Sequence, residues 1–384
     1  MRAMDFVRVL FLSERSHGTF DMIDDEVGRP FFLAKYLAKD TDLIWAVLTD
    51  RGDVPAIERR DLGAGTVEVH SVRVPRGPLF LRYPRFLWHV LNLCKSREPH
   101  VAVLTREMGE IVCGIATSHL RGIPWVVDFT DNYATYRYGL NQSRVQAWAI
   151  RNSSFFSCAS PSLREMILGT NPKAEVFLLP NGFEPNAGPR PLKMDLRNRL
   201  GIPEDAKVVI YAGQVRTSKG IEILLDALRF VRETSPQRIV LLLVGPLTDS
   251  GAAIARSIPD TTGTVGAVSR SEALQWMQAA DVGVLPYPPT RFSHYGFPLK
   301  LFEFLSSGLR VVATPTPSAT WAASQFPEVL VSRGYDAPSI AASLLEAVQS
   351  PPSPNASSFE AYEWGRMVAR FTVWIESRVL TRSA

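Results

Sequence analysis

One short segment of the chain holds a lysine and a glutamate at a spacing suited to a nucleotide. Residues 295–308, YGFPLKLFEFLSSG, put a glycine–proline turn directly before a helix that is expected to end at the last glycine. Free N–H groups and the dipole at a helix N-terminus favour an anion, so a diphosphate would bind near Pro298 and Leu299, where Lys300 adds a full charge. Glu303 follows about one turn later on the same side, where its carboxylate would accept two hydroxyl hydrogens from the cis-diol of a ribose. The segment therefore predicts a diphosphate site beside a ribose site, the alternative being an ordinary amphipathic helix packed on a sheet.

The same segment resembles the donor-site signature of retaining glycosyltransferases of family four, the glycosyl transferases group 1, which have the GT-B fold. In that family two glutamates are usually separated by seven residues: Glu303 matches the second, and Tyr295 stands in place of the first. The segment resembles a subgroup that lacks the first glutamate. The resemblance implies a hexosyltransferase that moves a sugar from a nucleotide diphosphate sugar, with a UDP-sugar favoured, to an acceptor hydroxyl with retention.

A second donor element is expected in the loop 213–220, which follows an apolar run and opens a helix. The loop is similar to the family pattern of glycine, arginine and leucine followed by a lysine–glycine pair. Gly213 matches the glycine, Lys219 matches the lysine that contacts the diphosphate, and Gln214 stands where the arginine is expected. We expect Arg216 to supply the missing charge, because two cations beside a diphosphate stabilise the leaving group as negative charge develops. For Lys219 the alternative is a solvated loop lysine.

A base-binding loop is expected further along the same half. Gly266 and Ala267 lie where similar enzymes hold the nucleotide base through backbone groups. For Gly266, a simple turn after a short strand is the alternative interpretation.

The first half of the chain is expected to hold the acceptor. Residues 127–132, VDFTDN, end a predicted strand where family members often carry a histidine–aspartate pair. Asp131 matches the aspartate and is the third expected catalytic residue beside Lys219 and Glu303, whereas Thr130 stands at the histidine. Asp128 or Asp131 would position an acceptor hydroxyl, and a capping role explains Asp131 equally well. Glu107 is a further candidate.

Two other segments of the first half suggest function. The loop 13–28 is long and ends in acidic residues, which suggests a lid that attracts a cationic acceptor, with His17 as either a base or a loop histidine. Residues 75–95 mix arginines with aromatic residues, and their apolar positions have helical spacing. Such a helix would either lie peripherally on a membrane surface or face the protein core with its arginines solvated.

The positions of these motifs follow from an alternation of short apolar runs and amphipathic stretches, which predicts an α/β fold of parallel βαβ units. Two Rossmann-like, doubly wound domains facing a cleft are expected: an acceptor domain over residues 1–184 and a donor domain over 185–364, with a C-terminal helix, 365–384, crossing back to the first. The expected strands are 7–12, 43–48, 67–72, 101–104, 125–129, 155–159, 176–179, 208–212, 239–244, 264–265 and 282–285.

Composition narrows the class of protein further. The 384 residues are 46% hydrophobic and 21% charged, and no apolar run approaches the ~20 residues of a membrane span. Three cysteines without metal-ligand spacing indicate buried thiols in a reducing cytoplasm, and the N-terminus leads into a strand rather than a signal peptide. We expect a bacterial protein. A net charge of +4 suits an anionic substrate or the inner membrane face, while its scatter disfavours nucleic acid. We expect a nucleotide diphosphate sugar as co-substrate, and we expect neither a cofactor nor a metal.

Two alternatives to a transferase remain open. One is a sugar-nucleotide epimerase on the same fold, since fold alone does not fix chemistry. The other is a non-catalytic or partner-dependent relative that keeps the nucleotide-binding scaffold. Departures from the family pattern support the second alternative, and they lie at Thr130, Gln214 and Tyr295.

Overall fold

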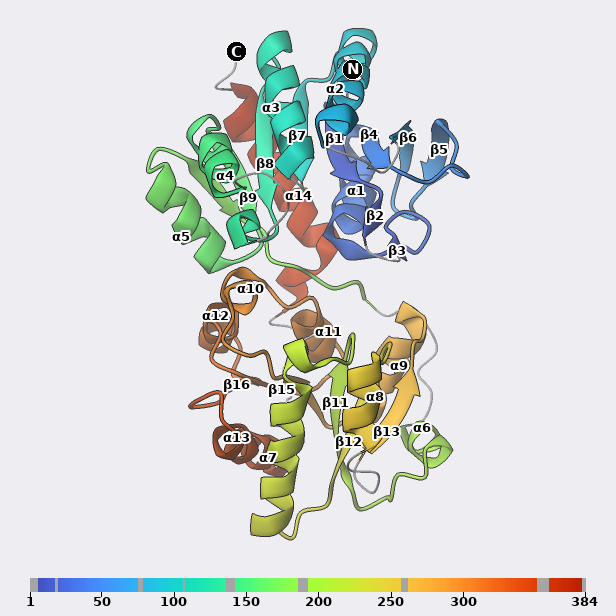
Figure 1. The fold of residues 1–384 in the computed structure, drawn as a ribbon, viewed down its shortest axis with the longest axis vertical. Helices are drawn as coiled ribbons and strands as arrows, with labels where there is room; N and C mark the ends of the chain where they lie inside the picture. Colours follow the sequence, from blue (N-terminus) through green and yellow to red (C-terminus); the bar gives the residue numbers. More distant parts are fainter. Residues whose placement is uncertain are drawn as a thin grey trace, which may run out of the picture. The chain divides into compact units, whose positions relative to one another are not determined.

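The protein divides into two compact α/β units (Figure 1). The computed structural model describes residues 6–17, 20–74, 79–105, 108–135, 142–185, 193–256, 262–350 and 359–381. One unit comprises Met1–Asn181 with Trp364–Ala384, and the other comprises Gly182–Glu363. The chain therefore enters the second unit once and returns to the first with its last helix.

The first unit is built on a sheet whose described strands follow the order β10-β9-β8-β7-β1-β4-β6-β5. All neighbours are parallel except β5 and β6. Its strands are β1 (Arg8–Glu14), β4 (Asp42–Thr49), β5 (Ile57–Asp61), β6 (Thr66–Arg73), β7 (Val101–Thr105), β8 (Trp125–Phe129), β9 (Phe155–Cys158) and β10 (Glu175–Leu178). Its helices are α1 (Gly28–Asp40), α2 (Leu79–Arg97), α3 (Met108–Arg121), the turn η1 (Tyr133–Thr135), α4 (Gln142–Arg151), α5 (Pro161–Thr170), α14 (Trp364–Trp374) and η5 (Ile375–Leu380).

The C-terminal helix α14 packs on the first unit, as predicted. The ring of Trp364 stacks on Phe32 of α1 with centroids 5.4 Å apart. Further along the helix, Trp374 packs against Phe155 of β9 and Phe177 of β10, at 6.1 and 5.5 Å. These large rings bury apolar area on both elements, so the last helix is part of the core of the first unit.

The long loop after β1 holds a hairpin and an ion-pair network instead of a bare acidic lid. Strands β2 (Ser16–His17) and β3 (Phe20–Asp21) pair antiparallel. The guanidinium of buried Arg15 donates to Asp21 and to Glu58, both at 2.8 Å, and Arg51 donates to Asp21 at 2.6 Å. Arginines therefore pair with Asp21 of the loop and reduce the negative charge on which the expected attraction of a cationic acceptor rests. The side chain of His17 lies outside the described part of the structure.

The second unit is a parallel, doubly wound sheet with the strand order β13-β12-β11-β14-β15-β16. Its strands are β11 (Lys207–Ala212), β12 (Ile239–Val244), β13 (Thr262–Gly266), β14 (Val282–Leu285), β15 (Arg310–Ala313) and β16 (Val329–Val331). Its helical segments are α6 (Lys193–Arg199), η2 (Thr217–Lys219), α7 (Ile221–Thr234), α8 (Asp249–Arg256), α9 (Arg270–Ala279), α10 (Arg291–Tyr295), α11 (Lys300–Ser306), α12 (Pro317–Gln325), α13 (Ala337–Gln349) and η4 (Glu360–Tyr362). The strand order reverses between β11 and β14, which is where such sheets bind ligands.

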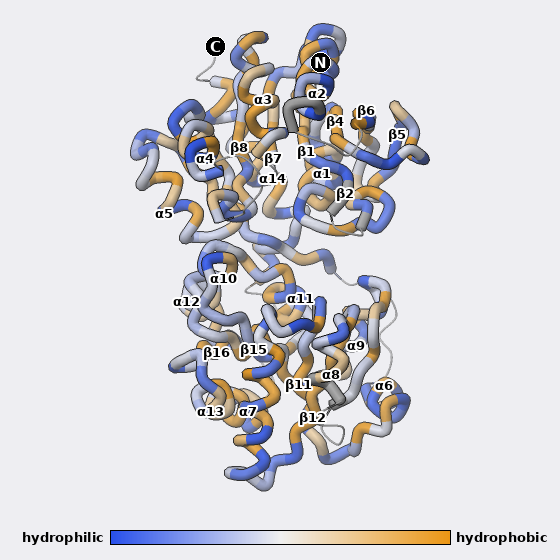
Figure 2. The backbone as a smooth tube through the Cα atoms, viewed as in Figure 1, coloured by the Kyte–Doolittle hydropathy of each residue, from blue (hydrophilic) through white to orange (hydrophobic). Residues whose placement is uncertain are grey.

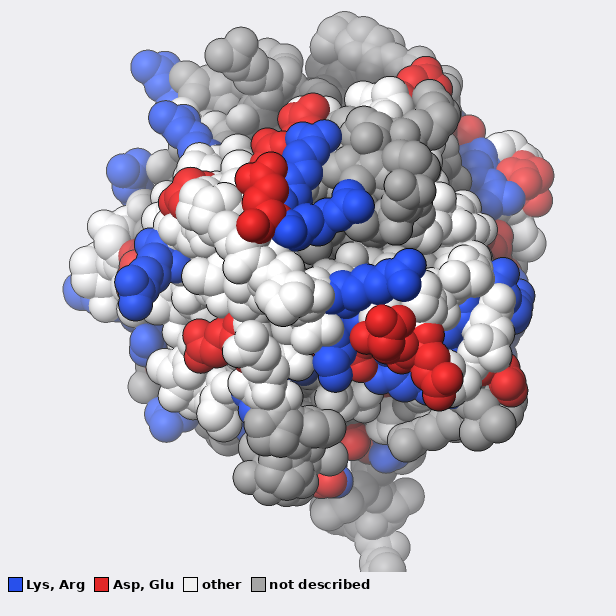
Figure 3. Space-filling view, turned by 90° about the horizontal axis from the view of Figure 1, so that it is seen from below, with Lys and Arg blue, Asp and Glu red and all other residues white. Residues whose placement is uncertain are grey.

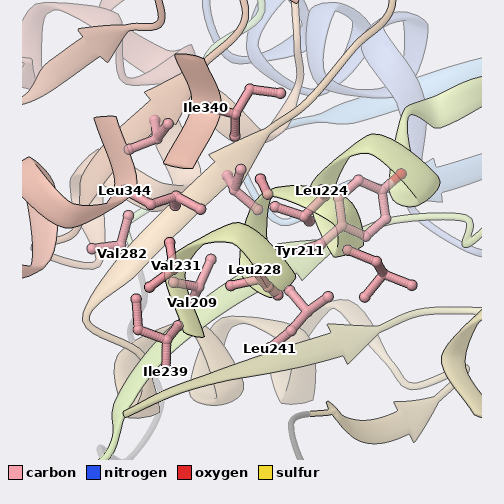
Figure 4. Close-up of a cluster of buried hydrophobic side chains, with 14 of the residues drawn as sticks. Val209, Tyr211, Leu224, Leu228, Val231, Ile239, Leu241, Val282, Ile340 and Leu344 are labelled. Atoms are coloured by element: carbon pink, nitrogen blue, oxygen red, sulfur yellow. The ribbon is translucent and has the colours of Figure 1, made fainter. Parts of the chain in front are cut away.

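The sheet of the second unit is covered on one face by α7 and α13 (Figure 4). Their apolar stripes bury Leu224 and Leu344 against alternate strand residues such as Val209 and Val282. On the opposite face, the ring of Phe304 in α11 packs against Gly283 of β14. Figure 2 shows the strands of both units as mainly hydrophobic and many connecting loops as hydrophilic. The core thus fixes α11, with its lysine and glutamate, against the sheet.

Four global features bear on function. None of the described helices combines the length and apolar character needed to cross a membrane. The described residues also bring no three histidine, cysteine, aspartate or glutamate side chains together as a metal site requires. On the face drawn in Figure 3, basic and acidic side chains are interspersed among the coloured residues. The cysteines are buried and free, as predicted, and burial raises the pKa of Cys158 to about 12.

Candidate nucleotide site

Three glycines lie side by side where β11, β12 and β13 end. The N–H of Gly213 donates to the carbonyl of Val244 at 2.8 Å, and the N–H of Gly245 donates to the carbonyl of Gly266 at 2.7 Å. A Cβ on Gly245 would lie 2.2 Å from the Gly213 oxygen, so the two loops meet without room for a side chain. The carboxyl end of the sheet is therefore lined by backbone, to which a ligand can come close. Sequence reasoning identified Gly213 and Gly266 but missed Gly245.

The loop after β11 is joined to the end of β14 at the switch point. Gly220, between η2 and α7, has a φ of +79°. A Cβ there would lie 1.7 Å from the carbonyl oxygen of Pro286, which follows β14. Gly220 therefore needs to be glycine for two reasons, its left-handed backbone and its contact with Pro286. The contact between Gly220 and Pro286 holds the preceding residue, Lys219, at the switch point.

Lys219 lies over two aromatic rings of the β14 side of this site. Its Nζ is 4.5 Å from the ring centroid of Phe292 in α10 and 5.5 Å from that of Tyr287. The faces of both rings attract a cation. Burial raises the pKa of Tyr287 to about 12, which keeps its phenol neutral. The structure thus places the predicted phosphate lysine at the switch point, beside an aromatic surface that the sequence did not reveal.

The positions expected to complete the basic pair differ in their contacts. The carbonyl of Gln214 accepts a hydrogen bond from the buried Tyr211 hydroxyl at 3.0 Å. Its backbone therefore shapes the loop even though its side chain is not the family's arginine. Arg216 is exposed and has extended backbone directly before η2. Arg216 thus lies three residues before Lys219 in the same loop.

Glu303 is a buried carboxylate held by two cations. It is 6% exposed, its Oε2 lies 2.7 Å from Nζ of Lys300, and its Oε1 lies 3.2 Å from Nη2 of Arg270. Burial alone would raise the pKa of Glu303, but the charges of Lys300 and Arg270 and their hydrogen bonds outweigh it and hold that pKa below its usual range. The group therefore stays ionised inside the protein, in the form that accepts hydrogen bonds from hydroxyls.

The packing of α11 explains why Glu303 keeps this position. The side chains of Phe302 and Phe304 on either side of it are fully buried, and Phe302 stacks on Tyr362 at 4.4 Å. The helix begins at Lys300, with Leu299 already in helical conformation, so Pro298 and Leu299 form its entry turn as predicted. Before that turn lies the short helix α10, which ends at Tyr295 and was not predicted.

Arg270 is the main residue of this cluster that sequence reasoning missed. It is the first residue of α9, whose N-cap Ser269 accepts a hydrogen bond from the backbone of Glu272. Of the predicted base-binding residues, Gly266 ends β13 and Ala267 begins the short loop directly before this helix. The sequence does show an arginine at the start of the helix that follows the predicted base-binding loop, and this position could have identified it. Its contacts with Glu184 and Glu303 could not be predicted, because both residues are far away in the sequence.

In the first unit, the structure separates the two acceptor candidates. Asp128 is 0% exposed and accepts hydrogen bonds from Arg29 at 2.7 and 2.9 Å, from Thr105 at 2.8 Å and from Ser157 at 2.7 Å. Asp128 is therefore an internal structural group. Asp131 accepts the N–H of Asn132 at 2.7 Å, which is a turn-capping contact. Glu107 lies outside the described residues.

The basic helix is only partly as predicted. Within α2, Phe86 and Val90 are buried, and Leu87 and Leu91 are half-buried. Its apolar face therefore packs on the protein, so that face is not a membrane surface. Trp88 is 67% exposed and is the large apolar side chain that this helix presents to solvent in its described part. Residues 75–78 lie outside the described ranges.

Comparison with known proteins adds sequence and fold relatives. The chain is 28% identical over 191 residues to a D-inositol 3-phosphate glycosyltransferase of Stackebrandtia nassauensis, covering 46% of this chain and 42% of the relative. The match thus spans less than half the length of that curated relative. The fold is similar to that of sucrose-phosphate synthase from Thermosynechococcus elongatus, with a TM-score of 0.75 at 18% identity over 98% of this chain and 100% of that one. HepE of Anabaena gives 0.66 at 16% identity over 98% and 97%.

Both halves of the chain also match family models. Residues 36–182 match the glycosyl transferase 4-like domain, and residues 206–350 match glycosyl transferases group 1. The two matches fall in the two compact units and together span most of the sequence. The first unit therefore carries a glycosyl transferase 4-like domain and the second a glycosyl transferases group 1 domain, and the two doubly wound units share the predicted GT-B fold class with the solved structures.

Proposed function

We propose that this protein transfers a sugar from a nucleotide diphosphate sugar to an acceptor hydroxyl, and that the donor is a UDP-sugar. The observation that carries the proposal is the buried Glu303, which Lys300 and Arg270 hold in the same unit whose sheet ends in a backbone-lined edge at Gly213, Gly245 and Gly266. The neighbours support the choice of base, because HepE was solved with UDP and an Escherichia coli trehalose-6-phosphate protein with UDP-2-fluoro glucose.

The donor would bind along the carboxyl end of the second sheet. The ribose diol donates to Glu303, and the base lies against the loop at Gly266 and Ala267. Lys219 and Arg216 face the diphosphate from the β11 loop, and Lys300 faces it from the entry turn at Pro298 and Leu299. An ammonium has three N–H donors, so the contact of Lys300 with Glu303 leaves donors for a phosphate.

The proposed reaction retains the anomeric configuration. The bond from the anomeric carbon to the diphosphate oxygen breaks, and a bond to the acceptor oxygen forms on the same face. The acceptor proton passes to the leaving diphosphate. The protein then contributes positioning and electrostatic stabilisation, with Lys219 at the developing charge and Asp131 orienting the acceptor hydroxyl. No metal and no enzyme nucleophile take part in this scheme, unlike retaining hydrolases with two carboxylates about 5 Å apart.

The setting of the reaction is proposed from the sequence and α2. The acceptor belongs to polysaccharide, glycolipid or natural-product glycoside synthesis, and the protein acts in the cytoplasm. Exposed Trp88 and neighbouring Arg85 would make peripheral contact with the inner membrane face. Sedimentation with anionic vesicles tests this: Trp88→Ser should reduce binding, and equal sedimentation of both proteins contradicts it.

Turnover with labelled nucleotide sugars tests the proposed function. The expected result is release of UDP that depends on a sugar acceptor, with NMR showing the donor's anomeric configuration in the product. A non-catalytic relative is the second candidate, because Tyr295, Gln214 and Thr130 replace family residues. Nucleotide binding without sugar transfer or donor hydrolysis, across donors and acceptors, would support that candidate instead.

A further inference from the structure

Arg270 joins two carboxylates from distant parts of the second unit. Its Nη1 lies 3.2 Å from Oε2 of Glu184, and its Nε and Nη2 lie 3.3 and 3.2 Å from Oε1 of Glu303. A planar guanidinium can hold two carboxylates at once because its N–H donors point along different edges, which an ammonium on a flexible stem cannot reproduce. Arg270 is thus a fixed bridge between α11 and the segment that contains Glu184.

That segment is where the chain enters the second unit. Glu184 lies two residues after Gly182, the first residue of the unit. The N–H of neighbouring Phe183 donates to the carbonyl of Tyr362 at 3.3 Å, so the entering and returning segments run side by side. The ring of Tyr362 in turn stacks on Phe302, next to Glu303 in α11. We call the entering residues 182–184 the crossing segment. The helix that carries Glu303 is linked to this segment through Arg270, and it contacts the returning segment directly through the ring of Tyr362.

We propose that Arg270 is a positioning residue that fixes Glu303 for the ribose of the nucleotide and ties it to the crossing segment through Glu184. The proposal rests on the nucleotide site of the proposed function. It adds that this site is connected, through Arg270, to residues 182–184, where the chain enters the second unit.

The geometry gives each group a separate task. Arg270 occupies Oε1 of Glu303 and Lys300 occupies Oε2, so the carboxylate is oriented from both sides. Each carboxylate oxygen accepts two hydrogens; Oε1 already faces two N–H groups of Arg270, so the remaining acceptor capacity for a ribose hydroxyl lies at Oε2 beside Lys300. Glu184 holds the far edge of the guanidinium. Without that anchor the guanidinium gains freedom, and Glu303 loses one of its two orienting contacts.

Thermodynamic linkage makes this connection reciprocal. If ordering of the crossing segment favours the orientation of Glu303 that binds ribose, then nucleotide binding must order the crossing segment by the same factor. Nucleotide should therefore slow hydrogen exchange of the amides at 182–184, including that of Phe183. The effect should require Arg270, because the route passes through its guanidinium.

Calorimetric titration of UDP tests the positioning role. Arg270→Gln should weaken binding about tenfold or more, as expected for hydrogen bonds to a charged group. Arg270→Lys should keep only part of the wild-type UDP affinity, because lysine keeps the positive charge but lacks the planar guanidinium that donates to both carboxylates. Glu184→Gln should weaken binding in the wild-type background and have little effect in Arg270→Gln. The matched control is Arg229→Gln, which removes an exposed ion pair of α7 and should change nothing.

Hydrogen exchange with and without UDP completes the test. Protection of 182–184 by UDP in the wild type, lost in Arg270→Gln at saturating UDP, supports the proposal. Unchanged UDP affinity in folded Arg270→Gln, or additive effects of Arg270→Gln and Glu184→Gln, overturns it while leaving the nucleotide site intact. Should the wild type bind no nucleoside diphosphate, the proposed function fails and this proposal with it. Arg270→Lys and Glu184→Gln keep the test decisive if Arg270→Gln does not fold.

Discussion

The Nζ of Lys300 lies 2.7 Å from Oε2 of Glu303, three residues later in the same helix. The sequence suggested separate roles for the two residues, one at a phosphate and one at a ribose. Their pairing adds a third role, in which the lysine keeps a buried carboxylate ionised before any ligand arrives. A buried charge is tolerated only when it is paired and hydrogen-bonded. The ion pair therefore keeps the Glu303 carboxylate charged and in place, and it also holds the Lys300 ammonium next to that carboxylate.

Substitution of Glu303 and Lys219 should separate the ribose contact from the phosphate contact. Glu303→Ala should weaken both uridine and UDP by at least about tenfold, because it removes hydrogen bonds to a charged group. Lys219→Ala should weaken UDP by a similar factor and leave uridine unchanged. Calorimetry measures both, with the exposed residues Glu233 and Lys173 changed to alanine as controls. Equal effects of Lys219→Ala on uridine and UDP would contradict the assigned phosphate role.

Removal of Lys300 should move the pH dependence of nucleoside binding. Lys300 and Arg270 face Glu303 directly, with Glu184 beyond Arg270. Together they lower the pKa of Glu303, so the carboxylate stays ionised and uridine binding should persist as the pH falls through the ordinary glutamate range of about 4–5. In Lys300→Gln the raising effect of burial is less opposed, so the carboxylate is protonated earlier and uridine binding should decline at higher pH. Uridine is the probe because it has no phosphate; coincident profiles for the two proteins refute the argument.

Gly220→Ala should damage the second unit more than an ordinary left-handed glycine does. The φ of +79° costs an alanine roughly 1–2 kcal/mol, and the added Cβ would also meet the Pro286 carbonyl oxygen. Gly201→Ala is the matched control, because Gly201 has a φ of +63° and nothing lies within 4 Å of its added Cβ. Thermal unfolding should show a larger loss for Gly220→Ala, together with weaker UDP binding. Similar losses in both variants would mean that the contact with Pro286 is unimportant.

Arg29→Met should destabilise the first unit without touching the donor site. The change leaves the fully buried Asp128 without its guanidinium, and breaking such a pair costs about 3–5 kcal/mol. The same guanidinium donates to the Leu179 carbonyl at 2.6 Å, so the end of β10 also loses a contact. Arg151→Met, at an exposed position of α4, is the control. We expect a lower first-unit unfolding temperature with UDP affinity unchanged, and an unaltered melt would refute the structural role of Asp128.

Much of the fold was predictable because parallel strands are short apolar runs bounded by turn residues. β12, with the sequence IVLLLV, is buried at every position and was predicted to the residue. β5 was missed because its sequence, IERRD, alternates exposed and half-buried residues at the edge of a sheet. Helices α6, α8 and α10 are short and give little periodic signal.

The candidate site was predictable only where its residues are close in sequence. Lys300 and Glu303 share one helix, so their proximity follows from helical geometry. Arg270 lies 33 residues from Glu303 and 86 from Glu184, and only the assembled sheet brings these three together. Asp128 looked like an acceptor contact because it lies next to the end of a strand, but tertiary contacts with Arg29 make it structural.

The nucleotide site of the second unit is expected to bind a nucleoside diphosphate through Glu303 and Lys219. Its most direct test is a calorimetric titration of the wild-type protein with UDP, GDP, TDP and ADP and their common sugars. We expect micromolar binding of UDP and of at least one UDP-sugar, reduced in Glu303→Ala and Lys219→Ala. Binding of none of these ligands would contradict it, and so would binding that both variants retain in full.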